Sequence, residues 1–185
     1  MTPASDTRAQ LVDAFAAALA ATGYPGLSLT EVAASSGIKK PSLYHHFPGG
    51  KEQLYEEAAQ RFSRDLGERI GRALAEGAGF EDRLVRLARV AALHANEAIS
   101  FEQRVYEALD HVAPDIRERV SSVYVASVLA PVVDLFVAAA RDGEVSGDPE
   151  FLADAFLHLA RASGPEGERA AEVVRVFLDG AAPTA

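Results

Sequence analysis

The chain has 185 residues, of which 49% are hydrophobic, with no cysteine, no tryptophan and a formal net charge of −9. The absence of cysteine excludes disulfides and thiolate metal or redox centres. The aromatic content of only 8% favours close-packed helices over a β-sandwich. Residues 1–51 carry four basic and three acidic side chains, a net charge of +1, so the acidity lies in the remaining residues. An acidic body with a locally cationic N-terminal part disfavours indiscriminate binding to nucleic acid.

The first predicted helix covers residues 6–22. Leu11, Phe15 and Leu19 repeat there at helical spacing, and Gly23 with Pro25 ends the pattern. This helix is expected to pack on the segment that follows it.

Residues 28–55 predict two short helices about a glycine turn, which is the pattern of a helix-turn-helix. Ser28 followed by Glu31 matches a capping box at the start of the first short helix. Gly37 ends that helix, because the turn needs a positive φ, and Pro41 suits the first turn of the second helix. The shared core is expected to consist of Val32, Ala33, Ile38, Leu43 and Phe47.

The second short helix is left with a polar surface rich in hydrogen-bond donors, which fits a DNA major groove. The adjacent His45 and His46 suggest a metal site, but neighbouring residues on a helix point about 100° apart and make a poor chelate. We therefore predict no metal and no cofactor. The donor-rich surface consists of Lys39, Lys40, Ser42, Tyr44, His45 and His46.

A long helix is expected over residues 51–76, with Gly67 and Gly71 weakening or bending its second half. Capping and turn signals then divide the rest of the chain into further helices. Pro131 is expected to kink the third of them and to widen a gap beside it. The predicted ranges are 81–97, about 101–112, 114–141, 148–162 and a last helix ending near 179.

Residues 123–140 are almost entirely apolar, which raises the question of a membrane span. The segment is short for a span, contains Asp134 and is flanked by charge, so we interpret it as the innermost helix of a bundle. The N-terminus shows no basic region followed by an apolar run, so no secretory signal is predicted and we expect a cytoplasmic protein.

Two sites are predicted in the body of the chain. A mainly apolar ligand pocket beside the Pro131 kink is expected from Phe62, Leu66, Phe101, Val105, Leu109, Val128, Asp134 and Phe136. The last two helices carry more apolar surface than one body should cover, and we favour a homodimer interface over ordinary core burial. Its predicted residues are Phe151, Leu152, Ala155, Phe156, Leu159, Val173, Val174 and Phe177.

The run Ser28-Leu-Thr-Glu-Val-Ala, the following Ser-Gly-Ile, and Ser42-Leu-Tyr-His-His-Phe47 with Lys51-Glu-Gln-Leu54 closely resemble the tetracycline-repressor (TetR) family of bacterial transcriptional regulators. The resemblance covers the first third of the chain. It implies a homodimer that blocks a promoter until a small molecule binds the larger domain.

Carried onto this chain, the resemblance implies that Lys39, Lys40, Pro41, Ser42 and His45 face bases. It also implies that Tyr44, His46 and Lys51 bind phosphates, together with Ser28 and Thr30. The link from Phe47 to Lys51 is one residue longer than the family's commonest form, and the Lys39–Lys40 pair is more cationic than usual.

The sequence therefore predicts an all-α protein. Residues 1–50 form a three-helix DNA-binding domain, and residues 51–185 form a ligand-binding and dimerisation bundle that a long helix joins to it. The expected partners are double-stranded operator DNA, a small hydrophobic effector and a second copy of the chain, with no membrane. A regulator of the same fold that needs no ligand is the alternative. An enzyme is the remote one, because no nucleophile elbow, phosphate loop or catalytic triad can be placed.

Overall fold

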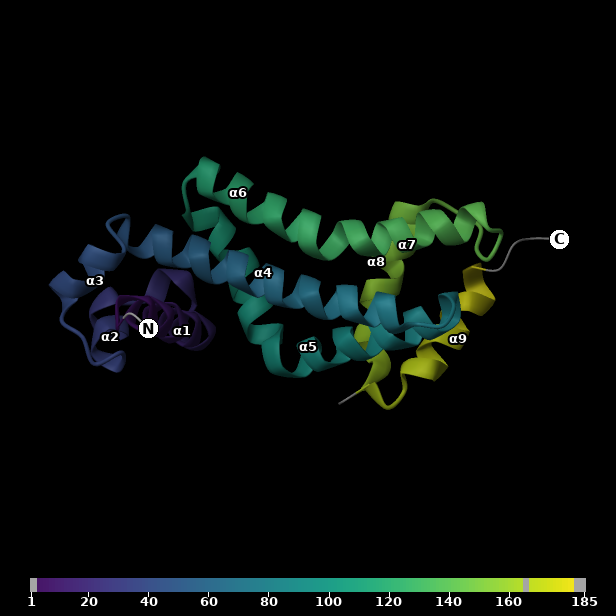
Figure 1. Cartoon of the computed structure of the whole chain (residues 1–185), viewed down its shortest axis with the longest axis horizontal. Coiled ribbons are helices and arrows are strands. Elements are labelled where there is room, and N and C mark those ends of the chain that lie inside the picture. Colours follow the sequence, from purple (N-terminus) through teal and green to yellow (C-terminus); the bar gives the residue numbers. More distant parts are fainter. Residues whose placement is uncertain (1–2, 165–166, 182–185) are drawn as a thin grey trace. The chain divides into compact units, whose positions relative to one another are not determined.

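The computed structural model describes the backbone of residues 3–164 and 167–181 and the side chains of residues 7–92, 101–164 and 167–181. The described residues contain helices and turns but no strand, so the all-α prediction is confirmed (Figure 1). The long and short α-helices are α1 (Pro3–Gly26), α2 (Leu29–Ser35), α3 (Lys40–His46), α4 (Gly50–Glu76), α5 (Phe80–Ala108), α6 (Pro114–Tyr124), α7 (Ala130–Arg141), α8 (Pro149–Ala160) and α9 (Ala170–Ala181). Three single turns complete the order: η1 (Leu109–His111), the π-helical η2 (Val125–Leu129) and η3 (Arg161–Ser163).

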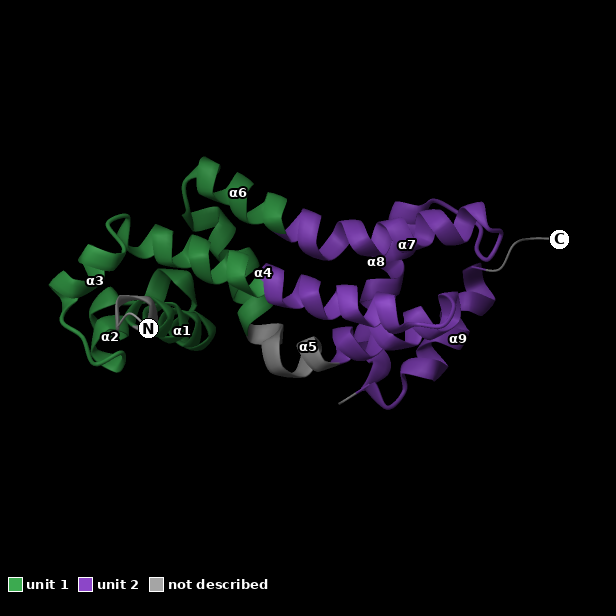
Figure 2. Ribbon diagram, in the orientation of Figure 1, with its two compact units in different colours: residues 1–62, 100–123 green, residues 63–99, 124–185 purple. Residues whose placement is uncertain are grey.

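The chain divides into two compact units (Figure 2). Unit 1 comprises residues 1–62 and 100–123, and unit 2 comprises residues 63–99 and 124–185. Helices α4 and α5 each contribute to both units. The predicted domain boundary between residues 50 and 51 lies at the start of α4, whereas the compact units separate within α4. The limits of the functional domains remain a prediction.

The core of unit 1 joins the first three helices to two later segments. Phe15 of α1, Leu43 of α3 and Leu54 of α4 are fully buried in one cluster. The hydroxyl of Tyr55 in α4 donates a hydrogen bond of 2.8 Å to the backbone carbonyl of Val105 in α5. Residues 100–123 are therefore part of the structure that supports the helix-turn-helix, which the sequence did not suggest.

The core of unit 2 is built around Phe136 of α7. Its ring lies 5.6 Å from that of Phe80, 5.9 Å from that of Phe156 and 5.7 Å from that of Phe177. The contacts with Phe80 and Phe177 are edge-to-face and that with Phe156 is tilted. Edge-to-face ring contacts add to the free energy gained by burying the rings. Helices α5, α7, α8 and α9 are thereby held around one aromatic cluster.

Helix α5 corrects one predicted boundary. The expected break between residues 97 and 101 is absent, and a single helix runs from Phe80 to Ala108. No glycine or proline occurs between residues 80 and 113, so nothing forces the helix to end at the Ser100 capping signal.

The segment predicted as one kinked helix over residues 114–141 is α6, the π-helical turn η2 and α7. Pro131 has no N–H group and its ring clashes with the carbonyl four residues earlier in a regular helix, which is that of Ser127. Ser127 lies inside η2, so the wider π-turn accommodates the proline without ending the helix.

The backbone carbonyl of Ser127 also accounts for the glycine at position 67 of α4. A Cβ atom at Gly67 would lie 2.6 Å from the carbonyl oxygen of Ser127, so only glycine allows this approach. A Cβ atom at Gly71 would meet nothing within 4 Å. The two glycines that the sequence treated alike therefore have different roles.

The expectation that residues 123–140 form the innermost helix is wrong. Among the described helices, Pro114–Arg141 is the one long and apolar enough to cross a membrane by length and composition, but only 28% of its most apolar window is buried. Val125 and Val137 are each 50% exposed. An apolar face of this segment is therefore left uncovered in the single chain.

Candidate functional site

The turn between α2 and α3 has the predicted geometry. Gly37 has a φ of +69°, and its N–H donates to the carbonyl of Ala34 at 3.0 Å while that of Ile38 donates to Ala33 at 3.0 Å. These bonds satisfy carbonyls at the end of α2. The predicted capping box is not formed: Ser28 occupies the N-cap position of α2, but its side chain accepts no capping hydrogen bond.

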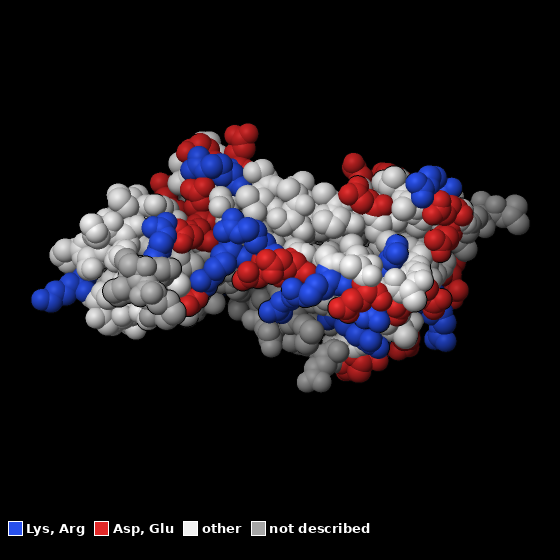
Figure 3. Space-filling model, viewed as in Figure 1, with Lys and Arg blue, Asp and Glu red and all other residues white. Residues whose placement is uncertain are grey.

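Helix α3 is fixed by one buried face and presents the other to solvent. Leu43 and the following Phe47 are fully buried, whereas Lys40, Tyr44 and His45 are exposed. Lys39 lies at the N-cap in an extended conformation, and its carbonyl accepts from Ser42 at 2.9 Å. In Figure 3 the basic side chains at the α3 end of unit 1 project from an otherwise uncharged surface. The predicted base-facing residues Lys39, Lys40, Pro41, Ser42 and His45 are thus all exposed on one short element.

The predicted phosphate-binding residues differ in their exposure to solvent. Thr30 and Tyr44 are exposed, while Ser28 and His46 are half-buried. The ring of Tyr44 rests against the start of α4, since a Cβ atom at Gly50 would lie 3.3 Å from its Cε1 atom.

Lys51 is directed toward the core of unit 1. Its ammonium lies 4.5 Å from the centre of the Tyr24 ring, and burial lowers the pKa of Lys51. Burial, with the charge of Glu52 as a smaller cause, raises the pKa of Tyr24 to about 12. A phosphate contact by Lys51 would therefore have to compete with its cation–π contact to Tyr24.

Arg8 of α1 is a contributor that the sequence analysis missed. Its guanidinium donates to the carbonyl of His46 at 2.7 Å, to both carboxylate oxygens of Glu57 in α4, and lies 4.2 Å from the centre of the Phe47 ring. One side chain thus connects the C-terminus of α3 to α1 and α4. No local pattern indicates this, because an isolated arginine on a helix looks like a solvated charge.

Replacing Arg8 with methionine should lower the free energy of unfolding by about 1–2 kcal/mol, because charge-assisted hydrogen bonds are lost and the His46 carbonyl loses a donor. Binding to DNA should weaken as well, because the C-terminus of α3 loses its hydrogen bond to Arg8 and is held less firmly in place. Urea denaturation and a DNA-binding titration would measure both effects.

Arg61→Met is the matched control. Arg61 pairs with Asp13 between the same two helices, but Asp13 is more exposed than Glu57 and neither residue of the pair belongs to α3. An exposed pair contributes about 0–1 kcal/mol. Equal losses of DNA binding in the two variants would contradict a specific role for Arg8.

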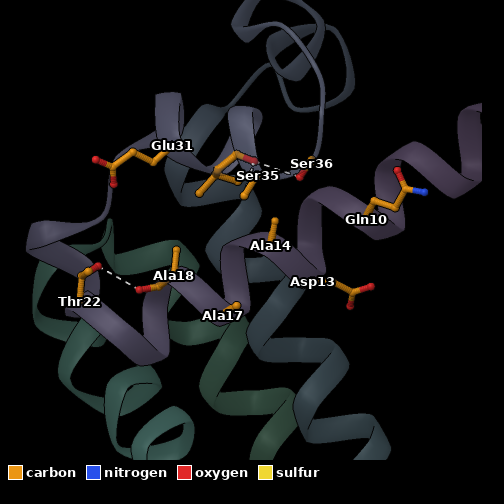
Figure 4. A pocket seen from close by; sticks show the side chains of 10 residues that line it. Gln10, Asp13, Ala14, Ala17, Ala18, Thr22, Glu31, Ser35 and Ser36 are labelled. Carbon is orange, nitrogen blue, oxygen red and sulfur yellow. Dashed lines mark hydrogen bonds between the residues drawn. The ribbon is translucent and has the colours of Figure 1, made fainter.

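A hollow of about 620 Å³ lies between α1 and α2 (Figure 4). Its walls are small, with Ala14, Ala17 and Ala18 on α1, so no side chain fills the space. The carboxylates of Asp13 and Glu31 stand at its edge. Those negative charges repel phosphate, so this hollow is not expected to bind the DNA backbone, in contrast to the positively charged surface of α3.

Among the described residues, no group of three or more His, Asp or Glu side chains is arranged to hold a metal ion. The rings of His45 and His46 lie 5.6 Å apart at an interplanar angle of 74°.

The predicted pocket residues are divided between the units. Phe62, Phe101, Val105 and Leu109 belong to unit 1, and Leu66, Val128, Asp134 and Phe136 belong to unit 2. The rings of Phe62 and Phe101 are in contact at 5.2 Å, and Phe136 is part of the aromatic core. The pocket as a whole remains a prediction.

Asp134 is exposed and lines a hollow of about 380 Å³ between η2, α7 and α8. Val125, Leu129 and Val133 provide apolar walls on one side. Glu150 and Asp154 add two more carboxylates on the other side. Ala130 of the lining precedes Pro131 in the chain, and the apolar walls with three carboxylates favour an apolar ligand without negative charge.

The structure places five of the predicted interface residues in the core of unit 2: Leu152, Phe156, Val173, Val174 and Phe177. Their periodicity therefore reports packing within one chain. Ala155 and Leu159 are half-buried, and Phe151 is 67% exposed. On α9, Val176 is the most exposed large apolar side chain at 57%.

Residues 11–58 match the family of bacterial regulatory proteins described as the tetR family. Among curated proteins, the chain is similar to the HTH-type transcriptional regulator LmrA of Bacillus subtilis (strain 168), with 38% identity over 65 residues. That match covers 35% of this chain and 35% of LmrA, so the chain spans about a third of the length of this relative.

Solved structures match nearly the whole chain. A tetR-family regulatory protein from Rhodococcus RHA1 superposes with a TM-score of 0.81 at 19% identity, covering 100% of both chains. AibR, solved with isovaleryl coenzyme A and operator DNA, superposes with a TM-score of 0.73 at 22% identity, covering 92% of this chain and 97% of AibR. At these identities the likeness shows a shared fold.

Proposed function

We propose that this chain, which carries the N-terminal domain of the tetR family of bacterial regulatory proteins over residues 11–58 and the fold of solved members throughout, is a ligand-responsive transcriptional regulator. The observation that carries the proposal is the exposed, donor-rich face of α3, held rigid by its buried opposite face. In the proposed mechanism a homodimer inserts one α3 helix into the major groove of each half of a palindromic operator. A small molecule that binds the body releases the DNA and so relieves repression.

Base recognition is assigned to the N-terminal end and outer face of α3. Lysine donors suit guanine O6 and N7, and Ser42 and His45 can donate or accept at base edges. Thr30 and Tyr44 are placed to bind phosphates that fix the register of the helix on the duplex. The local net charge of +1 in residues 1–51, within a chain of −9, leaves affinity to these few contacts.

The apolar residues left uncovered on the body support dimerisation. Phe151 of α8 and Val176 of α9 are exposed, although a soluble monomer gains free energy by burying such side chains. We assign them to the interface with a second copy of the chain.

Phe151→Arg should convert the protein to a monomer and reduce operator binding strongly, because one α3 helix reads too few base pairs for useful affinity. Val137→Arg is the matched control, since Val137 is 50% exposed on α7 and lies outside the assigned interface. Sedimentation and DNA titration would measure both variants. A dimer that persists in Phe151→Arg and is lost in Val137→Arg would move the interface to the α7 face.

The effector is proposed to be a small hydrophobic molecule. The hollow beside η2 has a volume within the range of about 300–1,000 Å³ that small-molecule sites occupy. The complex of AibR with isovaleryl coenzyme A and operator DNA supports the binding of both a small molecule and DNA by a chain of this fold.

The test begins by selecting bound duplexes from genomic fragments and screening hydrophobic compounds for a rise in melting temperature. A compound that is an effector should weaken binding to the selected duplex, and by linkage the duplex should weaken compound binding by the same factor. Stabilising compounds that leave DNA binding unchanged would favour a regulator that does not respond to them. Failure to select any duplex would contradict the proposed function itself.

A further inference from the structure

An arginine hollow lies on unit 2, and its lining shares no residue with the hollow beside η2. It occupies about 330 Å³ between the second half of α4 and the first half of α5. In Figure 3, basic side chains lie over these two helices, with acidic side chains between them. Residues three and four positions apart share one helix face, which brings the lining residues of each helix to the same hollow. The lining consists of Arg69, Arg72, Ala73, Glu76, Arg86, Arg89 and Val90.

The charge of this hollow is not balanced. Its lining contains four guanidinium groups and one carboxylate, that of Glu76, while the carboxylates of Glu68 and Asp82 pair with two of the arginines from outside the lining. Arg86 is held by Glu76 at 3.2 Å and Asp82 at 2.9 Å. The only acidic partner of Arg72 among the described residues is Glu68, at 3.8 Å on the same helix.

Arg69 and Arg89 form no ion pair with any residue that the structure describes. This is unexpected on composition, because the chain has 27 acidic and 18 basic residues and could supply carboxylates to every arginine. The charge of Asp82 acts on Arg89 from beyond ion-pair distance. Two guanidinium groups without an ion pair to a described residue, beside two paired ones, leave a local positive potential on an acidic protein. Such a concave cationic surface attracts anions.

We propose that the arginine hollow binds a phosphate-bearing anion, at a site separate from the hollow beside η2 that is proposed for the apolar effector. The guanidinium fork donates two parallel hydrogen bonds to phosphate, and several arginines around one hollow match a group with more than one negative charge. Arg86 is already oriented by its two carboxylate partners. Ala73 and Val90 line the hollow with apolar surface that a non-phosphate part of the ligand can cover.

The other hollow of unit 2 has the opposite electrostatic character. Asp134, Glu150 and Asp154 line it, and they repel a phosphate group. A phosphate-bearing ligand therefore has one favourable hollow on this unit among those described, and it is the one lined by arginine.

The test uses the full-length protein with inorganic diphosphate and coenzyme A as probes in isothermal titration calorimetry. The double variant Arg69→Gln/Arg89→Gln should lose about tenfold or more in affinity for whichever of the two probes binds, because charge-assisted hydrogen bonds are removed. Binding of both probes indicates a site for the free anion as well. Binding of coenzyme A alone indicates that the phosphates are recognised as part of a larger ligand.

The charge-matched control is Arg64→Gln/Arg175→Gln, which changes two exposed arginines of the same unit that do not line the hollow. It should bind the probes as the parent does. Equal losses in both double variants, or no binding of either probe to the parent, would overturn the proposal. A loss of affinity for random duplex DNA with unchanged probe binding would also overturn it, by making the surface a nucleic-acid contact. Selection of an operator by the parent is measured separately, so failure of this site is distinguishable from failure of the proposed function.

Discussion

Lys40→Ala and Tyr44→Ala should each weaken binding to the selected operator by about tenfold or more, because the first removes a base contact that contributes about 1–3 kcal/mol and the second removes a phosphate contact together with the ring that supports it. Lys40 is exposed at the first residue of α3, and Tyr44 is exposed one turn later. Neither side chain belongs to the buried core, so the circular dichroism spectrum and the dimer should be unchanged. Fluorescence anisotropy with labelled operator at several salt concentrations would measure the loss.

Two further variants distinguish the loss of a specific DNA contact from the loss of ring packing and from a general loss of positive charge. Tyr44→Phe keeps the ring that rests against Gly50 and removes only the hydroxyl, so it reports the phosphate contact alone. Arg175→Ala removes an exposed positive charge from α9 and should not change operator affinity. If Lys40→Ala and Arg175→Ala bind alike, α3 is not the recognition helix.

Gly67→Ala should destabilise the protein by about 1–3 kcal/mol, because the new methyl group would overlap the Ser127 carbonyl oxygen, which is backbone and cannot move alone. Gly71→Ala, four residues later on the same helix, should be neutral or stabilising by up to about 1 kcal/mol, since alanine is the better helix former and the site is open. Urea denaturation of the two variants would give the two free energies.

Gly71→Ala is a matched control for Gly67→Ala. The chemical change is identical and both sites lie on α4 within unit 2, so the difference isolates the contact with η2. A similar gain in stability for both variants would show that α4 does not pack closely on the π-turn.

The helix-turn-helix could be predicted from sequence because its determinants are local. Gly37 supplies the positive φ of the turn, Pro41 starts α3, and the buried residues Val32, Leu43 and Phe47 follow helical spacing over fewer than twenty positions. The all-α class followed from the same periodicity along the whole chain. Resemblance to the TetR family added the expected roles of the exposed residues.

Features that depend on contacts between distant residues were not predictable. The roles of Arg8 and Gly67 depend on partners about 40 to 60 residues away, at His46 and Ser127. Apolar periodicity in α8 and α9 could not distinguish a protomer core from an interface, because both bury one helix face. The continuity of α5 was missed since a capping signal is weak where no glycine or proline ends the helix.

The most direct test of the central claim is to locate α3 on the operator. The chain has no cysteine, so Ser42→Cys creates a single attachment point for an iron chelate that cleaves nearby DNA. Ser42 is exposed on α3, and Ser122→Cys on α6 of the same unit is the control. The account predicts two cleavage clusters from the Ser42→Cys protein, placed symmetrically about the centre of an inverted repeat and separated by about 34–36 Å or a longer spacing, each in a major groove. Cleavage that is absent, asymmetric or equally strong from the Ser122→Cys control would contradict it.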